Sequence, residues 1–202
     1  MTITGIVLAG GRSSRMGQDK ASLPFGNETM LARSVRMVSS VADDVNVVTR
    51  PIAGGGNPFL GLPASVRIVH DPVEDLGPLA GIAAGLSASN TDLNIIVACD
   101  MPLIRPAVLL RLIDLRGEAD ICVAVADGHA SPLCAVYRTS VGVVAQELLA
   151  SGERRVMALL DRVQTKRVDA AAFRDIDPAL ESFLSCNTPE AYAALLARRA
   201  EL

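Results

Sequence analysis

The chain has 202 residues, which allows one substantial hydrophobic core but leaves little room for a second domain. Half of its residues are hydrophobic and a fifth are charged, a composition typical of globular proteins. The net charge of −3, the aromatic content of 3% and the lack of Trp argue against a nucleic-acid-binding protein, which needs a basic surface and stacking aromatic rings.

The N-terminus and the cysteines indicate a cytoplasmic protein. The apolar run after Met1 is too short for a signal peptide or a membrane span, and no basic segment precedes it. Four cysteines stand in apolar surroundings and form no C-x-x-C pair: Cys99, Cys122, Cys134 and Cys186. We expect them to be reduced core residues rather than zinc ligands, and we expect no contact with membranes.

The first half of the chain alternates between predicted strands and helices. Runs of aliphatic residues bounded by turn residues predict strands, and apolar residues at helical spacing, such as Leu31, Val35 and Val38, predict helices. The expected strands are 3–9, 45–49, 66–70 and 94–99, and the expected helices are 29–40 and 77–86. The turn-rich stretch 51–58 is too short to separate two domains.

The second half continues this alternation. The expected helices are 106–115, 139–150, 155–161 and 189–199, and the expected strands are 121–126, 132–137 and 165–169. We expect the strand 132–137 to be antiparallel, because only a short hairpin-like link precedes it. Strands that alternate with helices predict an α/β fold with a mostly parallel, doubly wound sheet. Residues 1–202 are expected to form one domain.

A glycine-rich loop, residues 8–20, follows the first predicted strand. The adjacent Gly10 and Gly11 let backbone N–H groups approach anionic oxygens closely. Arg15 offers a forked donor for phosphate oxygens, and Lys20 offers a mobile positive charge. Open α/β sheets bind ligands at the carboxyl ends of their strands, where this loop lies. The loop is therefore predicted to bind the triphosphate of a nucleotide.

Two other phosphate-binding motifs do not fit this loop. Gly17 is followed by Gln18-Asp19-Lys20, which excludes the pattern G-x-x-x-x-G-K-[ST]. The glycine spacing also differs from the G-x-G-x-x-G of dinucleotide-dependent oxidoreductases. A glycine-rich surface turn is the remaining alternative, and the two cations beside the glycines argue against it.

Two aspartates stand at the ends of predicted strands. Asp100 ends the apolar strand 94–99, where a carboxylate is costly unless it is hydrated or paired with a cation. Mg²⁺ is commonly bound through one or two carboxylates plus substrate phosphates, so Asp100 is a candidate metal ligand. The alternative is that Asp100 caps the next helix. Asp71, after the strand 66–70, is compatible with an Asx turn as well as with a nucleotide contact.

These segments resemble the signatures of the sugar-nucleotide and cofactor nucleotidyltransferases. Residues 8–20, LAGGRSSRMGQDK, are similar to the pattern L-A-[GA]-G-x-[SG]-x-R-[ML]-G-x-[DP]-K. Residues 99–102 read CDMP, and residues 71–81 resemble the block D-x(5)-G-P-L-A-G. The resemblance implies a Rossmann-like three-layer sandwich in which the loop wraps the triphosphate.

The same resemblance assigns roles to individual residues. It implies that Asp100 binds Mg²⁺, with Mn²⁺ as a substitute, and that Arg15, Lys20 and Asp100 are the catalytic residues. The implied nucleotide contacts are Leu8, Ala9, Gly10, Gly11, Lys20, Asp71, Gly77 and Asp100.

Three segments of the second half narrow the resemblance to the molybdenum cofactor guanylyltransferase family. Residues 132–138 (PLCAVYR), 151–156 (SGERRV) and 187–190 (NTPE) are similar to the patterns P-L-x-A-[LV]-Y, G-E-R-[RK]-[VM] and N-x-N-T-P-E. The resemblance implies transfer of GMP from GTP to molybdopterin with release of pyrophosphate. It also implies transient contacts with other molybdenum-cofactor biosynthesis proteins or with apo-molybdoenzymes. The implied molybdopterin contacts are Arg154, Arg155, Ser185 and Asn187.

The sequence departs from the family pattern at two places. Ser185 stands where the pattern has Asn, and a hydroxyl has a shorter reach than an amide. Near the end of the second strand the family often has Asn, whereas this chain has Val47 or Val48, so that one base or ribose contact is either missing or made by Thr49.

Several alternatives remain open at this level. The segment NTPE also suits a helix N-terminus, and Arg154 with Arg155 also suits a solvated charged face. A cytidylyltransferase for the same cofactor and a nucleotidyltransferase for another phosphorylated precursor are alternative functions. A nucleotide-binding regulator without catalysis is a further alternative, against which the combination of Arg15, Lys20 and Asp100 argues.

Overall fold

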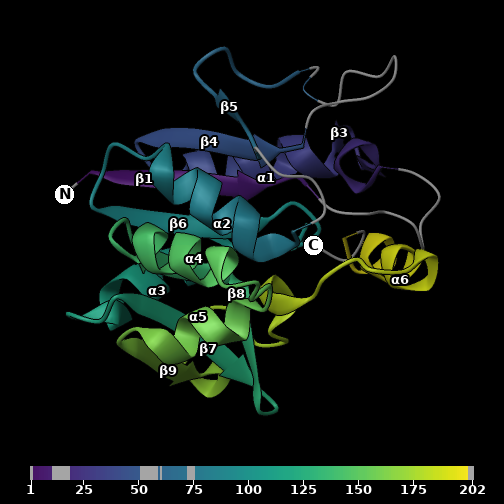
Figure 1. The fold of residues 1–202 in the computed structure, drawn as a ribbon. Helices are drawn as coiled ribbons and strands as arrows, with labels where there is room; N and C mark the ends of the chain where they lie inside the picture. Colours follow the sequence, from purple (N-terminus) through teal and green to yellow (C-terminus); the bar gives the residue numbers. More distant parts are fainter. Residues whose placement is uncertain (1, 11–18, 51–58, 60, 72–75, 200–202) are drawn as a thin grey trace.

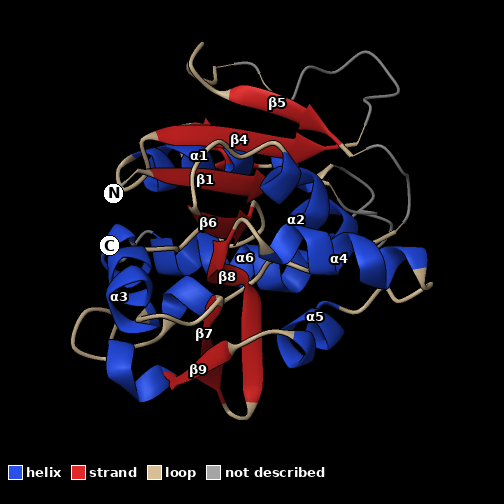
Figure 2. Cartoon of the chain, turned by 60° about the vertical axis from the view of Figure 1, so that its left-hand side comes forward, coloured by secondary structure: helices blue, strands red, loops and turns tan. Residues whose placement is uncertain are grey.

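A seven-stranded sheet runs through the middle of the computed structural model, which describes residues 2–10, 19–50, 59, 61–71 and 76–199 (Figure 1). The strands lie in the order β5-β4-β1-β6-β8-β7-β9, which Figure 2 shows from top to bottom. The bounds are Ile3–Leu8 (β1), Asp44–Thr49 (β4), Arg67–His70 (β5), Leu93–Ala98 (β6), Ile121–Ala126 (β7), His129–Arg138 (β8) and Thr165–Asp169 (β9).

The sheet is parallel except at β8. This strand pairs in antiparallel register with β6 on one side and with β7 on the other, as the short link before it predicts. The link is the turn Asp127-Gly128, in which both residues have positive φ, 50° and 77°. Two-residue hairpin turns favour such angles because their twist matches that of the strands. The hairpin therefore extends β8 back to His129, beyond the predicted start at residue 132.

Helices cover both faces of the sheet and form a three-layer α/β sandwich, so the predicted fold class is confirmed. One face carries α1 and α3, and the other carries α2, α4 and α5 (Figure 1). The bounds are Met30–Ser39 (α1), Pro78–Ser87 (α2), Pro106–Arg116 (α3), Val141–Ala150 (α4), Val156–Arg162 (α5) and Pro189–Arg199 (α6). Each lies within three residues of its predicted position at both ends.

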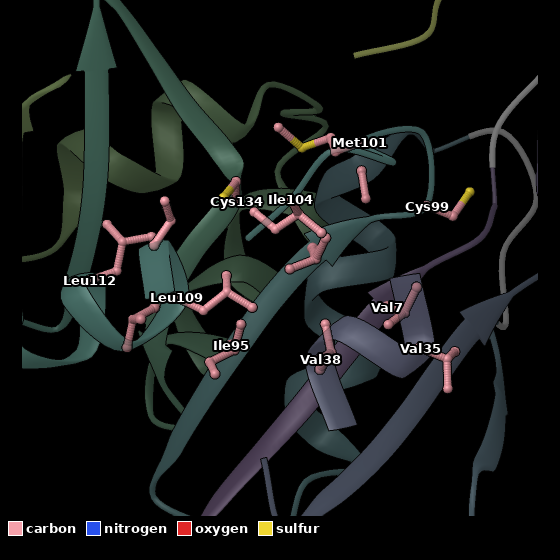
Figure 3. Close-up of a cluster of buried hydrophobic side chains, with 14 of the residues drawn as sticks. Val7, Val35, Val38, Ile95, Cys99, Met101, Ile104, Leu109, Leu112 and Cys134 are labelled. Carbon is pink, nitrogen blue, oxygen red and sulfur yellow. The ribbon is translucent and has the colours of Figure 1, made fainter. Parts of the chain in front are cut away.

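Alternation along the strands divides the core between the two faces. On β1, Val7 points toward the α1/α3 layer, whereas Ile6 and Leu8 point toward the α2/α4/α5 layer. On β4, Val47 and Val48 divide in the same way. Figure 3 shows part of the first cluster, where side chains of α1 and α3 meet those of the sheet.

Some short elements carry too little periodicity to be predicted. They include the small hairpin of β2 (Pro24–Phe25) and β3 (Glu28–Thr29), and the 3₁₀ turns η1 (Lys20–Ser22), η2 (Ala170–Phe173) and η3 (Glu181–Phe183). The turn-rich stretch 51–58 lies outside the described residues. In the described part of the chain, every helix is too short or too polar to cross a membrane.

The neighbouring strands β1 and β6 both end at the carboxyl edge of the sheet, so the chain exits from them at adjacent points. Leu8 lies in register with Ala98, and the Cys99 N–H donates to the Leu8 carbonyl over 3.0 Å. Later strands lie on either side of this pair, with β4 next to β1 and β8 next to β6. The carboxyl ends of β1 and β6 therefore form the topological switch point of the sheet, which is where open α/β sheets bind their ligands.

Two glycines of α2 provide a test of how tightly this layer packs. A Cβ on Gly85 would lie 2.6 Å from Ile6 Cγ2 and 3.1 Å from Val48 Cγ2, two methyl groups on rigid strands. A Cβ on Gly81 would make only ordinary contacts, 3.4 Å or more. We expect Gly85→Ala to lower the free energy of unfolding by about 1–3 kcal/mol through overpacking. The control Gly81→Ala should leave it unchanged or raise it by up to about 1 kcal/mol through helix propensity. Urea unfolding measures both, and equal values for the two variants would contradict the packing.

Candidate active site

The side chains of Lys20, Asp100 and Asn187 meet at the carboxyl edge of the sheet, although they are far apart in sequence. Lys20 Nζ lies 3.1 Å from Asp100 Oδ2 and donates to Asn187 Oδ1 over 2.8 Å. The Asn187 amide in turn donates to Ser185 Oγ over 2.7 Å. Four of the residues predicted for catalysis and for the acceptor site are thus brought together.

The turn that carries Lys20 is fixed by a cap and by burial. The Asp19 carboxylate accepts a hydrogen bond from the Ala21 N–H over 3.2 Å, which starts η1. Ala21 is buried in the core cluster on the α1/α3 face. Lys20 lies between Asp19 and Ala21, so its backbone is fixed at the point from which its side chain extends to Asp100 and Asn187.

Asp100 directly follows β6 and Cys99. Its backbone carbonyl accepts a hydrogen bond from the Cys186 N–H over 2.7 Å, and its side chain faces Lys20. The alternative that Asp100 caps the next helix is wrong, because α3 begins at Pro106 with Arg105 as its N-cap. Asp100 therefore remains available for a cation or a polar ligand.

Different partners are bound by the side chains of Ser185, Asn187 and Thr188. The Thr188 hydroxyl accepts from the Ala191 N–H over 3.2 Å and caps α6, as the helix-start pattern predicts. Asn187 instead turns its side chain toward Lys20. The sequence assigned Asn187 to the acceptor only, and its contact with Lys20 was not foreseen, because nothing in local spacing links positions so far apart.

A small apolar cluster stands behind the polar one. It joins the segment after Lys20 to the C-terminal part of the chain, and its buried members are Leu23, Phe25, Met30, Leu103, Cys186 and Leu195. The Tyr192 hydroxyl also donates to the Pro24 carbonyl. Burial of these apolar side chains is favourable, so it stabilises the packing of α6 and the segment before it against the residues that follow Lys20.

The site combines one carboxylate and one ammonium in a partly buried setting. Both side chains of the Lys20–Asp100 pair are 18% exposed. Burial raises the pKa of the neighbouring Cys99 thiol, and likewise that of Cys186, which favours the protonated form of both side chains.

The donor set fits Mg²⁺ better than a transition metal. In the described part of the chain no three His, Cys, Asp or Glu residues form a cluster that could hold a metal ion by themselves. Asp100 offers a hard oxygen ligand, and Mg²⁺ is usually bound by one or two carboxylates together with substrate phosphates. In this structure the Asp100 carboxylate is paired with one cation, the Lys20 ammonium.

The start of the predicted phosphate loop emerges next to this cluster. The Leu8 side chain is buried in the core, and the Ala9 N–H donates to the Val48 carbonyl over 2.8 Å. Gly10, the last described residue before the gap, is exposed. Gly11 and Arg15 lie outside the described residues.

Asp71 follows β5 at the same edge, and Gly77 precedes α2, which packs on β4 and β1. The Asp71 N–H donates to the Thr49 carbonyl over 2.8 Å, which continues the sheet by one residue. Gly77 is the N-cap of α2 and has a φ of 76°, an angle that favours glycine. The N-terminus of α2 therefore begins at the edge where the loop emerges, and helix N-termini attract anions.

The side chains near the end of β4, where the family pattern has Asn, are buried. Val47 and Val48 are both buried in the core, on opposite faces of the sheet. Thr49 is buried as well, and its hydroxyl donates to the Arg50 carbonyl over 3.1 Å. The Thr49 hydroxyl is thus engaged within the chain.

Arg154 and Arg155 lie in the turn between α4 and α5. Glu153 organises this turn, since its Oε1 accepts from both the Arg154 and the Arg155 N–H, at 2.8 and 2.9 Å. The Arg155 guanidinium lies 2.7 Å from Glu153 Oε2. The hydrogen bonds from Arg155 and from the backbone hold the pKa of Glu153 at about 2.

The same turn lies toward the carboxyl edge of the sheet. The first turn of α4 meets the last turn of α2, where a Cβ on Gly142 would lie 3.1 Å from Leu86 Cβ. The two helices therefore run antiparallel, and the end of α4 lies on the side where α2 begins. Both arginines are exposed there.

The chain matches known proteins over most of its length. The family model described as "MobA-like NTP transferase domain" matches residues 5–168. A molybdenum cofactor guanylyltransferase of Desulfosudis oleivorans is 32% identical over 93% of this chain and 91% of its own length. A "probable molybdenum cofactor guanylyltransferase" of Pelotomaculum thermopropionicum is 33% identical over 92% of this chain and 88% of its own length.

A solved structure shares the fold. The molybdopterin-guanine dinucleotide biosynthesis protein A of Archaeoglobus fulgidus superimposes with a TM-score of 0.83 at 22% identity. The match covers 98% of this chain and all of that one.

The geometry around Asp100 generates a prediction for metal-dependent nucleotide binding. Asp100→Asn keeps the side-chain shape, so the melting temperature should fall by no more than about 4 °C, as expected for loss of a partly exposed ion pair. The extra thermal stabilisation that Mg²⁺ adds to a bound nucleoside triphosphate should disappear. The control is Asp92→Asn, an aspartate that precedes the other end of β6 and pairs with Arg138 at 3.0 Å. Equal stabilisation of Asp100→Asn and wild type by nucleotide with Mg²⁺ would remove Asp100 from the metal site.

Proposed function

Because the chain belongs to the MobA-like NTP transferase domain family, we propose that it transfers GMP from GTP to molybdopterin and releases pyrophosphate. The observation that carries this proposal is the meeting of Lys20, Asp100 and Asn187 at one point. The loop that carries Lys20 follows β1, Asp100 follows β6, and Asn187 comes from the C-terminal segment. The predicted nucleotide and acceptor residues therefore face each other, as a group transfer between two substrates requires.

The reaction needs charge stabilisation and positioning more than proton transfer. A terminal phosphate oxygen of molybdopterin forms a bond to the α-phosphorus of GTP, and the bond from that phosphorus to the bridging oxygen breaks. The electron pair of the broken bond leaves with pyrophosphate. Since the attacking phosphate is already anionic, no general base is required, and catalysis rests on alignment and on preorganised positive charge.

Lys20 and Asp100 have complementary roles in this scheme. The Lys20 ammonium binds phosphate oxygens and stabilises the negative charge that grows on the leaving pyrophosphate. Arg15, in the same loop, is proposed to assist. Asp100 would hold Mg²⁺, which supplies Lewis-acid stabilisation of phosphate oxygens when bound. Without bound nucleotide, the Lys20 ammonium forms an ion pair with the Asp100 carboxylate.

The acceptor side is proposed to use the C-terminal segment and the α4–α5 turn. Asn187 and Ser185 offer an amide and a hydroxyl that are already oriented by their mutual hydrogen bond. Arg154 and Arg155 are exposed at the same edge of the sheet and suit an anionic group of molybdopterin. Glu153 stabilises the conformation of this turn by accepting two backbone hydrogen bonds.

The choice of base provides the first test of the proposal. Thermal unfolding with GTP, CTP, ATP or UTP, each with Mg²⁺, should show the largest stabilisation with GTP, because a ligand that binds only the folded state raises the melting temperature. Strong stabilisation by CTP without any by GTP would contradict guanylyl transfer and favour a cytidylyltransferase.

Lys20 provides the test of catalysis. Lys20→Ala should lower kcat/KM for pyrophosphate release by on the order of 10² or more, with a fall in kcat as well as weaker GTP binding, since the charge matters most in the transition state. Lys20→Arg should restore activity only in part, because a planar fork does not replace a compact ammonium.

The matched control is Lys166→Ala, which removes an exposed lysine on β9. It should retain wild-type kinetics. If Lys20→Ala raises the KM for GTP while kcat stays at the wild-type value, Lys20 binds nucleotide without taking part in catalysis.

A further inference from the structure

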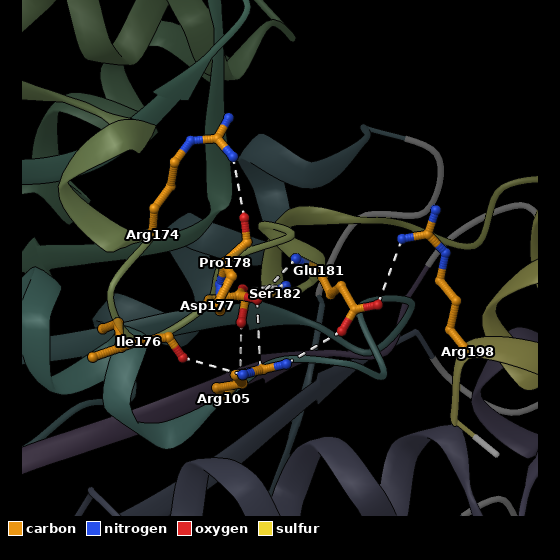
Figure 4. A network of polar contacts seen from close by, with 8 residues as sticks. All are labelled: Arg105, Arg174, Ile176, Asp177, Pro178, Glu181, Ser182 and Arg198. Atoms are coloured by element: carbon orange, nitrogen blue, oxygen red, sulfur yellow. Dashed lines mark hydrogen bonds and ion pairs between the residues drawn. The ribbon is translucent and has the colours of Figure 1, made fainter. Parts of the chain in front are cut away.

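Arg105 makes a set of contacts that neither the sequence patterns nor the proposed chemistry explain. It is the N-cap of α3, at the end of the loop that begins with Asp100. Its guanidinium donates to the Ile176 carbonyl over 3.1 Å and lies 3.5 Å from Asp177 Oδ1 and 3.3 Å from Glu181 Oε2 (Figure 4). All three contacts are with the segment that precedes Ser185 and Asn187.

Asp177 is the centre of this network. Its side chain is fully buried, and its carboxylate accepts hydrogen bonds from the Glu181 N–H over 3.1 Å and from the Ser182 N–H over 2.8 Å. A buried carboxylate is costly unless a cation and hydrogen-bond donors accompany it. Arg105 is the cation beside it, so the fold of residues 177–182 depends on Arg105.

The network extends to both neighbours of the segment. The Arg105 N–H donates to Ser182 Oγ over 3.1 Å, which fixes the start of α3 to η3. Glu181 also lies 3.5 Å from Arg198 on α6, so the same carboxylate holds the last helix (Figure 4). The left-handed backbone of Leu180, with a φ of 55°, turns the chain between Asp177 and Glu181.

The segment 182–187 is consequently attached at two points to the loop 100–105. Arg105 holds it at Ser182, and the Asp100 carbonyl accepts from the Cys186 N–H at the other end. Ser185 and Asn187 lie next to the second attachment point. A change at Arg105 would therefore shift Ser185 and Asn187 relative to Asp100 and Lys20, while the pairing of β1 with β6 stays in place.

We propose that Arg105 is a positioning residue for the acceptor substrate: through Asp177 and Glu181 it sets the place of Ser185 and Asn187 opposite the nucleotide. The proposal rests on the proposed function, because it takes the segment 182–187 as part of the acceptor site. A purely structural ion-pair network would influence both substrates equally or neither. The geometry instead predicts unequal effects, since Asp100 follows β6 and Lys20 is fixed by η1, whereas Arg105 contacts residues 176–182, which lead to Ser185 and Asn187.

Two conservative variants test the proposal. Arg105→Lys keeps the charge but loses the fork that reaches three partners. Glu181→Gln keeps the shape of the side chain and removes its charge, so it supports the test even if Arg105→Lys does not fold. The matched control is Arg138→Lys, because Arg138 likewise pairs with two carboxylates, Asp92 and Glu118, and its side chain is 25% exposed against 31% for Arg105. Arg138 ends β8, beside the start of β6 and away from the site.

Steady-state kinetics of pyrophosphate release give the first readout. In both Arg105→Lys and Glu181→Gln, the KM for molybdopterin should rise by about tenfold or more, because small misplacements of binding groups are costly. The KM for GTP should stay within about twofold of wild type, because β1, β6 and η1, which carry the nucleotide residues, keep their own contacts. The control Arg138→Lys should leave both KM values unchanged.

Cys186 gives a second readout that does not depend on activity. Its side chain is fully buried and it lies inside the segment that Arg105 is proposed to hold. Labelling with N-ethylmaleimide, followed by peptide mass spectrometry, should show faster modification of Cys186 in both test variants than in wild type. The buried Cys122 and Cys134 serve as internal references and should label at the wild-type rate.

The outcomes separate the two proposals. Wild-type protein that releases no pyrophosphate from GTP and molybdopterin contradicts the proposed function. Active wild type with Arg105→Lys and Glu181→Gln variants that change both KM values equally, or neither, overturns the positioning role. Cys186 that stays as protected as in wild type in both variants overturns it as well.

Discussion

The hydrogen-bonded pairing of β1 with β6 sets Leu8 beside Ala98, and the chain leaves both strands at this point. The first exit leads into the glycine-rich loop that ends at Lys20, and the second leads to Asp100. The β6 end places Asp100, and the turn η1, fixed by the Asp19 cap and the buried Ala21, places Lys20, so that the positive and the negative group meet at 3.1 Å. The helices that cover the sheet keep this pairing buried, so the core stabilises the geometry of the site directly.

The C-terminal segment depends on the same pairing. Cys186 binds the backbone of Asp100, Asn187 binds the side chain of Lys20, and the apolar cluster around Phe25 and Leu195 supports both contacts. The residues proposed for the acceptor are therefore attached to the residues proposed for the nucleotide. Under the proposed function, this arrangement explains how two large anionic substrates are aligned without a general base: fixed backbone positions and a shared ammonium provide the alignment.

Much of the fold could be predicted from the sequence because it is encoded locally. Buried strands such as Leu93–Ala98 are continuous apolar runs, and helices such as Met30–Ser39 combine an apolar stripe with a capping Thr29. The antiparallel strand β8 followed from the shortness of the link before it. The elements that were not predicted, the β2/β3 hairpin and the 3₁₀ turns, are two to four residues long, and their conformation depends on tertiary contacts rather than on periodicity.

The sequence by itself determined the class of the protein and the residue types of the site: a glycine loop with a terminal lysine, an aspartate after an apolar strand, and the segment with Asn187. Only the tertiary structure decided which of these residues touch. The contact of Lys20 with Asn187 spans 167 positions, and that of Arg105 with Glu181 spans 76. Such contacts leave no periodic pattern in the sequence, because they arise where separate elements pack together. The role of the buried Asp177 carboxylate can likewise be recognised only from the cation that the fold places beside it, Arg105.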